Sequence, residues 1–188
     1  MAENQDLAPI QVAGLRVVVE PQLQVASLRY FDRQGGFAGL VQDITGMILP
    51  DSLCAVLRGA EDRTWEAIIL AWRSPTETLM ISAAPTLIET LQGAAATRPD
   101  GCIVDQRGGT FVFRASGESV ADLIARLGGH GACPRIGESL RTRLADVAVL
   151  AVRVQPEETL LIVERSYGPH LMTAIRVSAA DLAIPLFS

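Results

Sequence analysis

The chain contains no lysine: all 16 of its basic residues are arginines, and they face 21 acidic residues, for a net charge of −5. Surfaces that bind nucleic acid or anionic membranes present a dense positive field, so this composition argues against both partners. Charged residues make up only 20% of the 188 positions, and hydrophobic residues 49%. Such a chain is not disordered, can bury a sizeable core, and is expected to have part of its surface covered by a partner.

Cysteine and histidine are also scarce. The three cysteines, Cys54, Cys102 and Cys133, are widely spaced and form no C-x-x-C pair, which excludes a disulfide framework and a zinc ribbon and fits a reducing cytoplasm. His130 lies near Cys133, but a metal site needs at least three protein ligands and no third is close in sequence. His170 lies beside Pro169 and is interpreted as a partly exposed imidazole. We therefore expect no metal site and no catalytic residue in this chain.

Targeting and phosphate-binding signals are missing as well. Glu3 and Asp6 stand where a signal peptide would need positive charge, and no apolar run approaches the ~20 residues of a membrane span. The glycine pairs at 35–36 and 108–109 match no phosphate-binding loop, so they are interpreted as turns. The chain is expected to be cytoplasmic.

An internal repeat organises the sequence. Residues 75–81 (PTETLMI) recur 81 positions later as residues 156–162 (PEETLLI), with five of the seven residues identical. An apolar run precedes each copy, a proline-containing turn opens it, and a second apolar stretch follows. This pattern predicts one β-hairpin in each half of the chain.

Helical patterns repeat with nearly the same offset. Two stripes with the i, i+3, i+4, i+7 spacing of a core-facing helix precede the hairpins, and two shorter apolar stripes follow them. The first stripes are Phe37, Leu40, Val41, Ile44 and Val120, Leu123, Ile124, Leu127; the later ones are Leu87, Ile88, Leu91 and Leu171, Met172, Ile175. Each half therefore has one helix before its hairpin and another after it.

Strands are also expected ahead of the first helix of each half, at residues 24–31 and 111–114. The second should pair with residues 102–106 through a tight turn whose two glycines, at 108 and 109, allow positive φ. The predicted fold is α+β, with duplicated βαββα (ferredoxin-like) halves related by pseudo-twofold symmetry. The expected divisions are a flexible arm over 1–12 and halves at 13–100 and 101–188, packed together as one compact unit.

A candidate partner interface involves arginine and tyrosine. Arg141 and Arg143 lie two positions apart and share a face, and Arg165 follows the last strand, so the three can converge on an anion or a partner carboxylate; a solvated face is the alternative. Tyr167 is close to Arg165, and both residue types are common in interface hot spots. Trp65 and Trp72 point to opposite faces of their strand, so at least one is expected away from the helices of its own half.

Several segments resemble the gamma subunit of heterotetrameric sarcosine oxidase. They are residues 101–127, Cys133-Pro134, residues 141–147 (RTRLADV), residues 160–171, where Arg165-Ser166 precedes an apolar helix, and the hairpin at 69–81. This family's fold is similar to the folate-binding domain of aminomethyltransferase, which is itself a duplicated α+β unit. The resemblance therefore implies the same duplication that the repeat predicts.

The resemblance also implies a function. This chain would be an accessory, non-catalytic subunit that binds no cofactor, while partner subunits carry FAD, FMN, NAD and tetrahydrofolate, oxidise sarcosine or another N-methyl amino acid, and transfer the one-carbon unit. The Leu-Asp-Leu-His stretch frequent in the family after Cys-Pro is replaced by residues 135–139 (RIGES), which leaves open a related amine-oxidising complex. The alternatives are a stand-alone folate-binding or folate-dependent one-carbon transfer protein, and a small-molecule binding protein that forms homo-oligomers.

Overall fold

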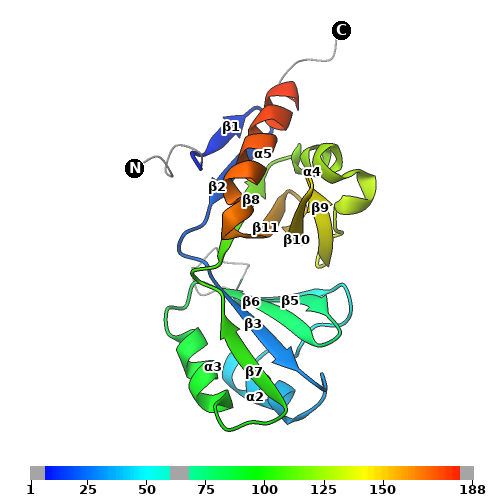
Figure 1. Cartoon of the computed structure of the whole chain (residues 1–188). Helices are drawn as coiled ribbons and strands as arrows, with labels where there is room; N and C mark the ends of the chain where they lie inside the picture. The colour runs from blue at the N-terminus through cyan, green and yellow to red at the C-terminus, as the bar shows by residue number, and fades with distance from the viewer. Residues whose placement is uncertain (1–6, 60–67, 183–188) are drawn as a thin grey trace. The chain divides into compact units, whose positions relative to one another are not determined.

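The computed structural model describes residues 7–59 and 68–182 (Figure 1). They form two compact units. Unit 1 comprises Met1–Pro21, Gly109–Ile136 and Leu140–Ser188, and unit 2 comprises Gln22–Gly108 and Gly137–Ser139. Trp65, one of the two tryptophans of the predicted strand, lies outside the described residues, so its orientation stays a prediction.

Unit 2 contains a five-stranded sheet in the order β4-β5-β6-β3-β7, with each neighbouring pair antiparallel. Two helices separate its strands in sequence. The elements are β3 (Gln24–Tyr30), α2 (Gly36–Thr45), β4 (Ala55–Arg58), β5 (Ile68–Ser74), β6 (Glu77–Ser82), α3 (Leu87–Ala95) and β7 (Gly101–Asp105).

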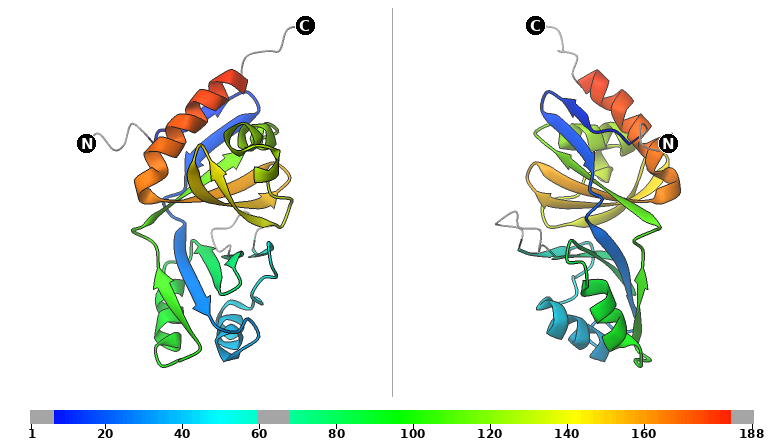
Figure 2. Two further views of the ribbon diagram at one scale, coloured as in Figure 1. Left: turned by 45° about the vertical axis from the view of Figure 1, so that its right-hand side comes forward. Right: turned by 90° about the vertical axis from the view of Figure 1, so that its left-hand side faces the viewer.

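The core of unit 2 lies between this sheet and its two helices (Figure 2). Phe37 and Val41 of α2, and Leu91 of α3, are fully buried against Leu28 and Tyr30 of β3. Because successive side chains of a strand point to opposite faces, Arg29 belongs to the face of the sheet away from the helices.

Unit 1 contains a six-stranded sheet in the order β1-β2-β8-β11-β10-β9. Its core gathers Phe113, Leu123, Leu161, Leu171 and Ile175, and α5 packs against β1 at one edge of the sheet (Figure 2). The elements are β1 (Ile10–Val12), β2 (Leu15–Val19), β8 (Thr110–Ser116), α4 (Val120–Gly128), a 3-10 turn (His130–Ala132), β9 (Ser139–Leu144), β10 (Val147–Gln155), β11 (Glu158–Glu164), a second 3-10 turn (Arg165–Tyr167) and α5 (Gly168–Leu182).

The two predicted hairpins and four predicted helices are confirmed. In the β5–β6 hairpin Leu79 lies opposite Ala71, and in the β10–β11 hairpin Leu160 lies opposite Val152, so the 81-residue offset holds in the register. Each hairpin also has a register shift at the same place, between Trp72 and Ser74 in the first and 81 positions later in the second. The fold is mixed α and β, with two antiparallel sheets; beyond the three strands of βαββα, unit 2 has β4 and β7, and unit 1 has β1, β2 and β9. Duplication and pseudo-twofold symmetry stay predictions.

The predicted hairpin between residues 102–106 and 111–114 is wrong. β7 pairs with β3, whereas β8 pairs with β2 and β11. Gly108 and Gly109 are absent from the glycines with positive φ. The chain passes from unit 2 to unit 1 at this point, so the strands on either side join different sheets and no tight turn is required.

The pairing of β2 and β7 also departs from the expected division of the chain. β2 precedes the first repeat but pairs with β8 of the second, and β7 precedes β8 but pairs with β3 of the first repeat. The compact units therefore do not coincide with residues 13–100 and 101–188. Residues 10–12 are not part of a flexible arm as expected, because Ile10–Val12 forms β1 and Ile10 is buried in the core of unit 1.

Candidate functional site

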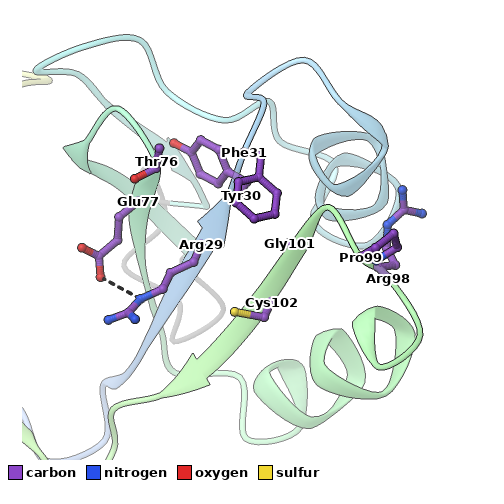
Figure 3. A pocket seen from close by; sticks show the side chains of 9 residues that line it. All are labelled: Arg29, Tyr30, Phe31, Thr76, Glu77, Arg98, Pro99, Gly101 and Cys102. Atoms are coloured by element: carbon purple, nitrogen blue, oxygen red, sulfur yellow. Dashed lines mark ion pairs between the residues drawn. The ribbon is translucent and has the colours of Figure 1, made fainter.

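A pocket of about 580 Å³ opens on unit 2 (Figure 3). It lies where the end of β3 meets the starts of β6 and β7, and its lining is mostly apolar. The lining residues are Arg29, Tyr30, Phe31, Thr76, Glu77, Arg98, Pro99, Gly101 and Cys102. The volume is within the range typical of small-molecule sites.

Strand register brings three polar side chains of the pocket into one row. Arg29 of β3 is directly opposite Glu77 of β6 on one side and opposite Cys102 of β7 on the other. Directly opposed residues of antiparallel strands point to the same face, which here is the face away from the helices. The row therefore crosses three strands, with the arginine in the middle and the Cys102 thiol exposed.

The Glu77 carboxylate is held by neighbours from two strands. The Ser27 hydroxyl donates to its Oε1 at 2.5 Å, and Nη1 of Arg73 at 3.1 Å. Nε of Arg29 is 3.7 Å from the same oxygen, an ion-pair distance beyond hydrogen-bond reach. Arg29 makes no side-chain hydrogen bond to any described residue, and its side chain is 57% exposed. Its guanidinium N–H groups are thus available to a ligand.

A second arginine of the pocket is already paired. Nε and Nη2 of Arg98 donate to the two carboxylate oxygens of Asp100 at 2.9 and 3.0 Å. The hydrogen bonds from Arg98 lower the pKa of Asp100, and the same pairing raises the pKa of Arg98. Asp100 also accepts the backbone N–H of Phe37 at 2.7 Å, in the first turn of α2. This carboxylate therefore stabilises the helix start beside the pocket.

Aromatic residues form the apolar part of the pocket. The Phe31 side chain is 84% exposed, while Tyr30 is buried and its hydroxyl lies 2.9 Å from Oγ1 of Thr78. Gly101 lies over the Phe37 ring so closely that a Cβ atom there would overlap the ring. Figure 3 shows Arg29 and Glu77 on one side of the aromatic pair, and Arg98 and Pro99 on the other.

The electrostatics of the pocket favour an anion. Its charged lining residues are two arginines, Arg29 and Arg98, and one carboxylate, Glu77. Two residues outside the lining pair with them: Arg73 with Glu77, and Asp100 with Arg98. Sequence reasoning missed this site because its residues come from three separate segments and match no motif. Of its lining residues, Thr76 and Glu77 belong to the repeated segment 75–81 that the sequence pattern marks.

The predicted interface residues all lie in unit 1 and are all exposed. Arg141 and Arg143 are alternate residues of β9, as their spacing predicted, and Arg143 donates to the backbone carbonyl of Asp146. Arg165 stacks on the Phe111 ring, 4.5 Å from its centroid. Tyr167 is 51% exposed. No contact joins these four side chains within the described residues, and their role as a partner surface stays a prediction.

The histidines and Cys133 have ordinary surroundings. A ring nitrogen of His170 lies 3.2 Å from the carbonyl oxygen of Ala145, and Cys133 Sγ lies 3.6 Å from Nη1 of Arg153. Within residues 7–59 and 68–182, no group of three or more His, Cys, Asp or Glu is placed to hold a metal ion. No helix in those ranges is both long enough and apolar enough to cross a membrane.

Comparisons with known proteins connect this architecture to solved structures. No protein-family model matches the sequence, and a search of curated proteins finds no match. The heterotetrameric sarcosine oxidase from Corynebacterium sp. U-96, in complex with pyrrole 2-carboxylate, contains a chain with 18% identity and a TM-score of 0.80. The match covers 100% of this chain and 94% of that one. This chain has the fold of a sarcosine oxidase subunit.

The second similarity is to an aminomethyltransferase. The glycine cleavage system aminomethyltransferase T from Bartonella henselae has 8% identity and a TM-score of 0.63, over 93% of this chain and 47% of that one. The present chain thus spans about half of that protein. Both resemblances inferred from the sequence are confirmed at the level of the fold.

Proposed function

We propose that this chain is the accessory, non-catalytic gamma-like subunit of a flavin-dependent sarcosine oxidase-type complex. The observation that carries the proposal is the end-to-end fold match: the TM-score is 0.80 over all of this chain and 94% of one chain of a heterotetrameric sarcosine oxidase. The aminomethyltransferase match stops at 47% of its protein. The match to the sarcosine oxidase chain therefore covers a larger share of the compared protein than the match to the aminomethyltransferase does.

The proposal assigns the chemistry to other chains. FAD, FMN, NAD and tetrahydrofolate would be bound by partner subunits, which oxidise sarcosine or a related N-methyl amino acid and pass the one-carbon unit to tetrahydrofolate. This chain would contribute surface, with Arg141, Arg143, Arg165 and Tyr167 as the contact residues. Its apolar, weakly charged composition supports a covered surface. We also propose that the complex is cytoplasmic.

The same proposal includes the origin of the fold. The shared hairpin register and the shared order of β3-α2-β4-β5-β6-α3 and β8-α4-β9-β10-β11-α5 support duplicated ferredoxin-like halves. Each of the two sets also has its own buried hydrophobic core, as expected of two copies that keep their packing residues.

Affinity purification from the native host tests this function. The tagged chain should bring down a flavin-containing protein, and the eluate should oxidise sarcosine or another N-methyl amino acid. The purified chain alone should be colourless and inactive. Capture of tetrahydrofolate by the isolated chain, without any flavoprotein, would favour the folate-binding alternative and contradict the accessory role.

A further inference from the structure

We propose that the pocket of unit 2 binds a small organic carboxylate whose body is a planar apolar ring system. This inference goes beyond the subunit function and does not rest on it, because every residue that lines the pocket belongs to unit 2 of this chain. The carboxylate would bind the Arg29 guanidinium, and the ring would pack against Phe31.

The hydrogen-bonding pattern of the pocket favours a negatively charged ligand. Arg29 is ion-paired with Glu77 at 3.7 Å but donates no side-chain hydrogen bond to a described residue, whereas Arg98 already donates to both oxygens of Asp100. A planar guanidinium with free N–H groups matches a carboxylate, to which it can donate two parallel hydrogen bonds. An ammonium group at the Glu77 carboxylate would meet the positive charges of Arg29 and Arg73, which both lie beside its Oε1.

The carboxylates around the pocket set an upper limit on ligand charge. Of the charged residues that line the pocket, Arg29 and Arg98 are positive and Glu77 is negative, which is an excess of one positive charge. A monoanion balances this excess, whereas a phosphate dianion would add repulsion from the carboxylates of Glu77 and Asp100. The chemistry therefore fits a monocarboxylate better than a phosphorylated ligand.

The shape and apolar lining of the pocket favour a ligand with a planar apolar ring. Phe31 is 84% exposed beside a mostly apolar cavity of about 580 Å³, which is large enough for one or two rings. Covering an exposed aromatic ring with a planar ligand removes apolar area from water and adds ring-stacking contacts.

Cys102 offers a direct readout of occupancy, because its exposed thiol lines the pocket and is opposite Arg29 in the register. The experiment measures the rate at which iodoacetamide alkylates Cys102, by mass spectrometry of its peptide. The probes are phenylacetate and indole-3-acetate, with phenylacetamide as the uncharged control. Cys54 and Cys133 report non-specific effects in the same molecule. We expect both acids to slow Cys102 alkylation several-fold in a saturable manner, and the amide to have little effect.

Variants of the full chain then test the assigned contacts. Arg29→Gln should raise the acid concentration needed for half-protection about tenfold or more, because it removes charge-assisted hydrogen bonds. Phe31→Ala should also weaken protection. Arg126→Gln and Val177→Ala, which change exposed residues of unit 1, are the matched controls and should behave as the parent chain. The proposal is overturned if neither acid protects Cys102, if the amide protects equally, or if Arg29→Gln leaves protection unchanged.

Discussion

Thr78 and Thr159 occupy equivalent places in the repeat, yet only the Thr78 hydroxyl has a hydrogen-bond partner within the described part of the chain. Thr78 is the second residue of β6 and Thr159 is the second residue of β11, 81 positions later, and both are fully buried. Oγ1 of Thr78 lies 2.9 Å from the Tyr30 hydroxyl, whereas Oγ1 of Thr159 has no hydrogen-bond partner among the described residues. The register explains the difference: Tyr30 is two residues beyond Leu28, the partner of Thr78 on β3, and the corresponding residue, directly after β8, is Gly117.

Replacing each threonine by valine should therefore have opposite effects on stability. Valine keeps the branched shape and removes the hydroxyl. Because a buried hydroxyl without a partner costs about 1–3 kcal/mol, Thr159→Val should raise the free energy of unfolding by about 1 kcal/mol. Thr78→Val leaves the Tyr30 hydroxyl unpaired in the core and should lower that free energy by about 1–2 kcal/mol. For a chain of this size, 1 kcal/mol moves the melting temperature by ~2–4 °C.

Urea unfolding followed by circular dichroism measures both changes, with thermal melting as a second probe. Tyr30→Phe should cost about as much as Thr78→Val, and the double variant should cost less than the sum, because both single changes break one hydrogen bond. If Thr159→Val destabilises the protein as much as Thr78→Val does, the Thr159 hydroxyl is paired and the reasoning fails.

Three further predictions concern packing, pH and assembly. Gly101→Ala should destabilise unit 2 by about 1–3 kcal/mol, because the new methyl group overlaps the buried Phe37 ring of α2. Gly108→Ala is the control and should be nearly neutral, because a Cβ atom there meets no atom within 4 Å. The urea midpoints of the two variants measure the difference. Pairing with Arg98 holds the folded-state pKa of Asp100 below its ordinary value, so the stability that Asp100 provides is present at neutral pH and is lost as pH falls through that lowered pKa. Asp100→Asn should therefore make the urea midpoint fall less steeply with decreasing pH. An unchanged pH dependence of the midpoint would contradict the pairing. Tyr167→Ala should weaken assembly by about 1–3 kcal/mol with little change in the isolated chain's melting temperature, while Arg126→Ala should leave assembly intact; the reverse pattern would show that Tyr167 serves the fold.

Local patterns in the sequence were sufficient to predict the helices and the two hairpins. The stripe containing Phe37 and Val41 became the buried face of α2, and the proline turns opened β6 and β11 where the repeat placed them. These features depend on residues close together in the chain, whose periodicity reports directly on burial.

Long-range pairing was not predictable in the same way. The segments before and after Gly108-Gly109 had the composition of a hairpin, but β7 pairs with β3 and β8 pairs with β2, more than 70 positions away in each case. The pocket was missed for a related reason. Arg29 is joined to Glu77 and Cys102 only by strand register, which single-sequence patterns do not specify.

Native mass spectrometry of the tagged chain purified from its own host tests the proposed function most directly. The proposed role predicts that the tagged chain is found in a hetero-oligomer with a flavin-bearing subunit, and that this complex oxidises an N-methyl amino acid. A tagged chain recovered only as a monomer or homo-oligomer, with all flavin-dependent amine oxidation left in the unbound fraction, would contradict it.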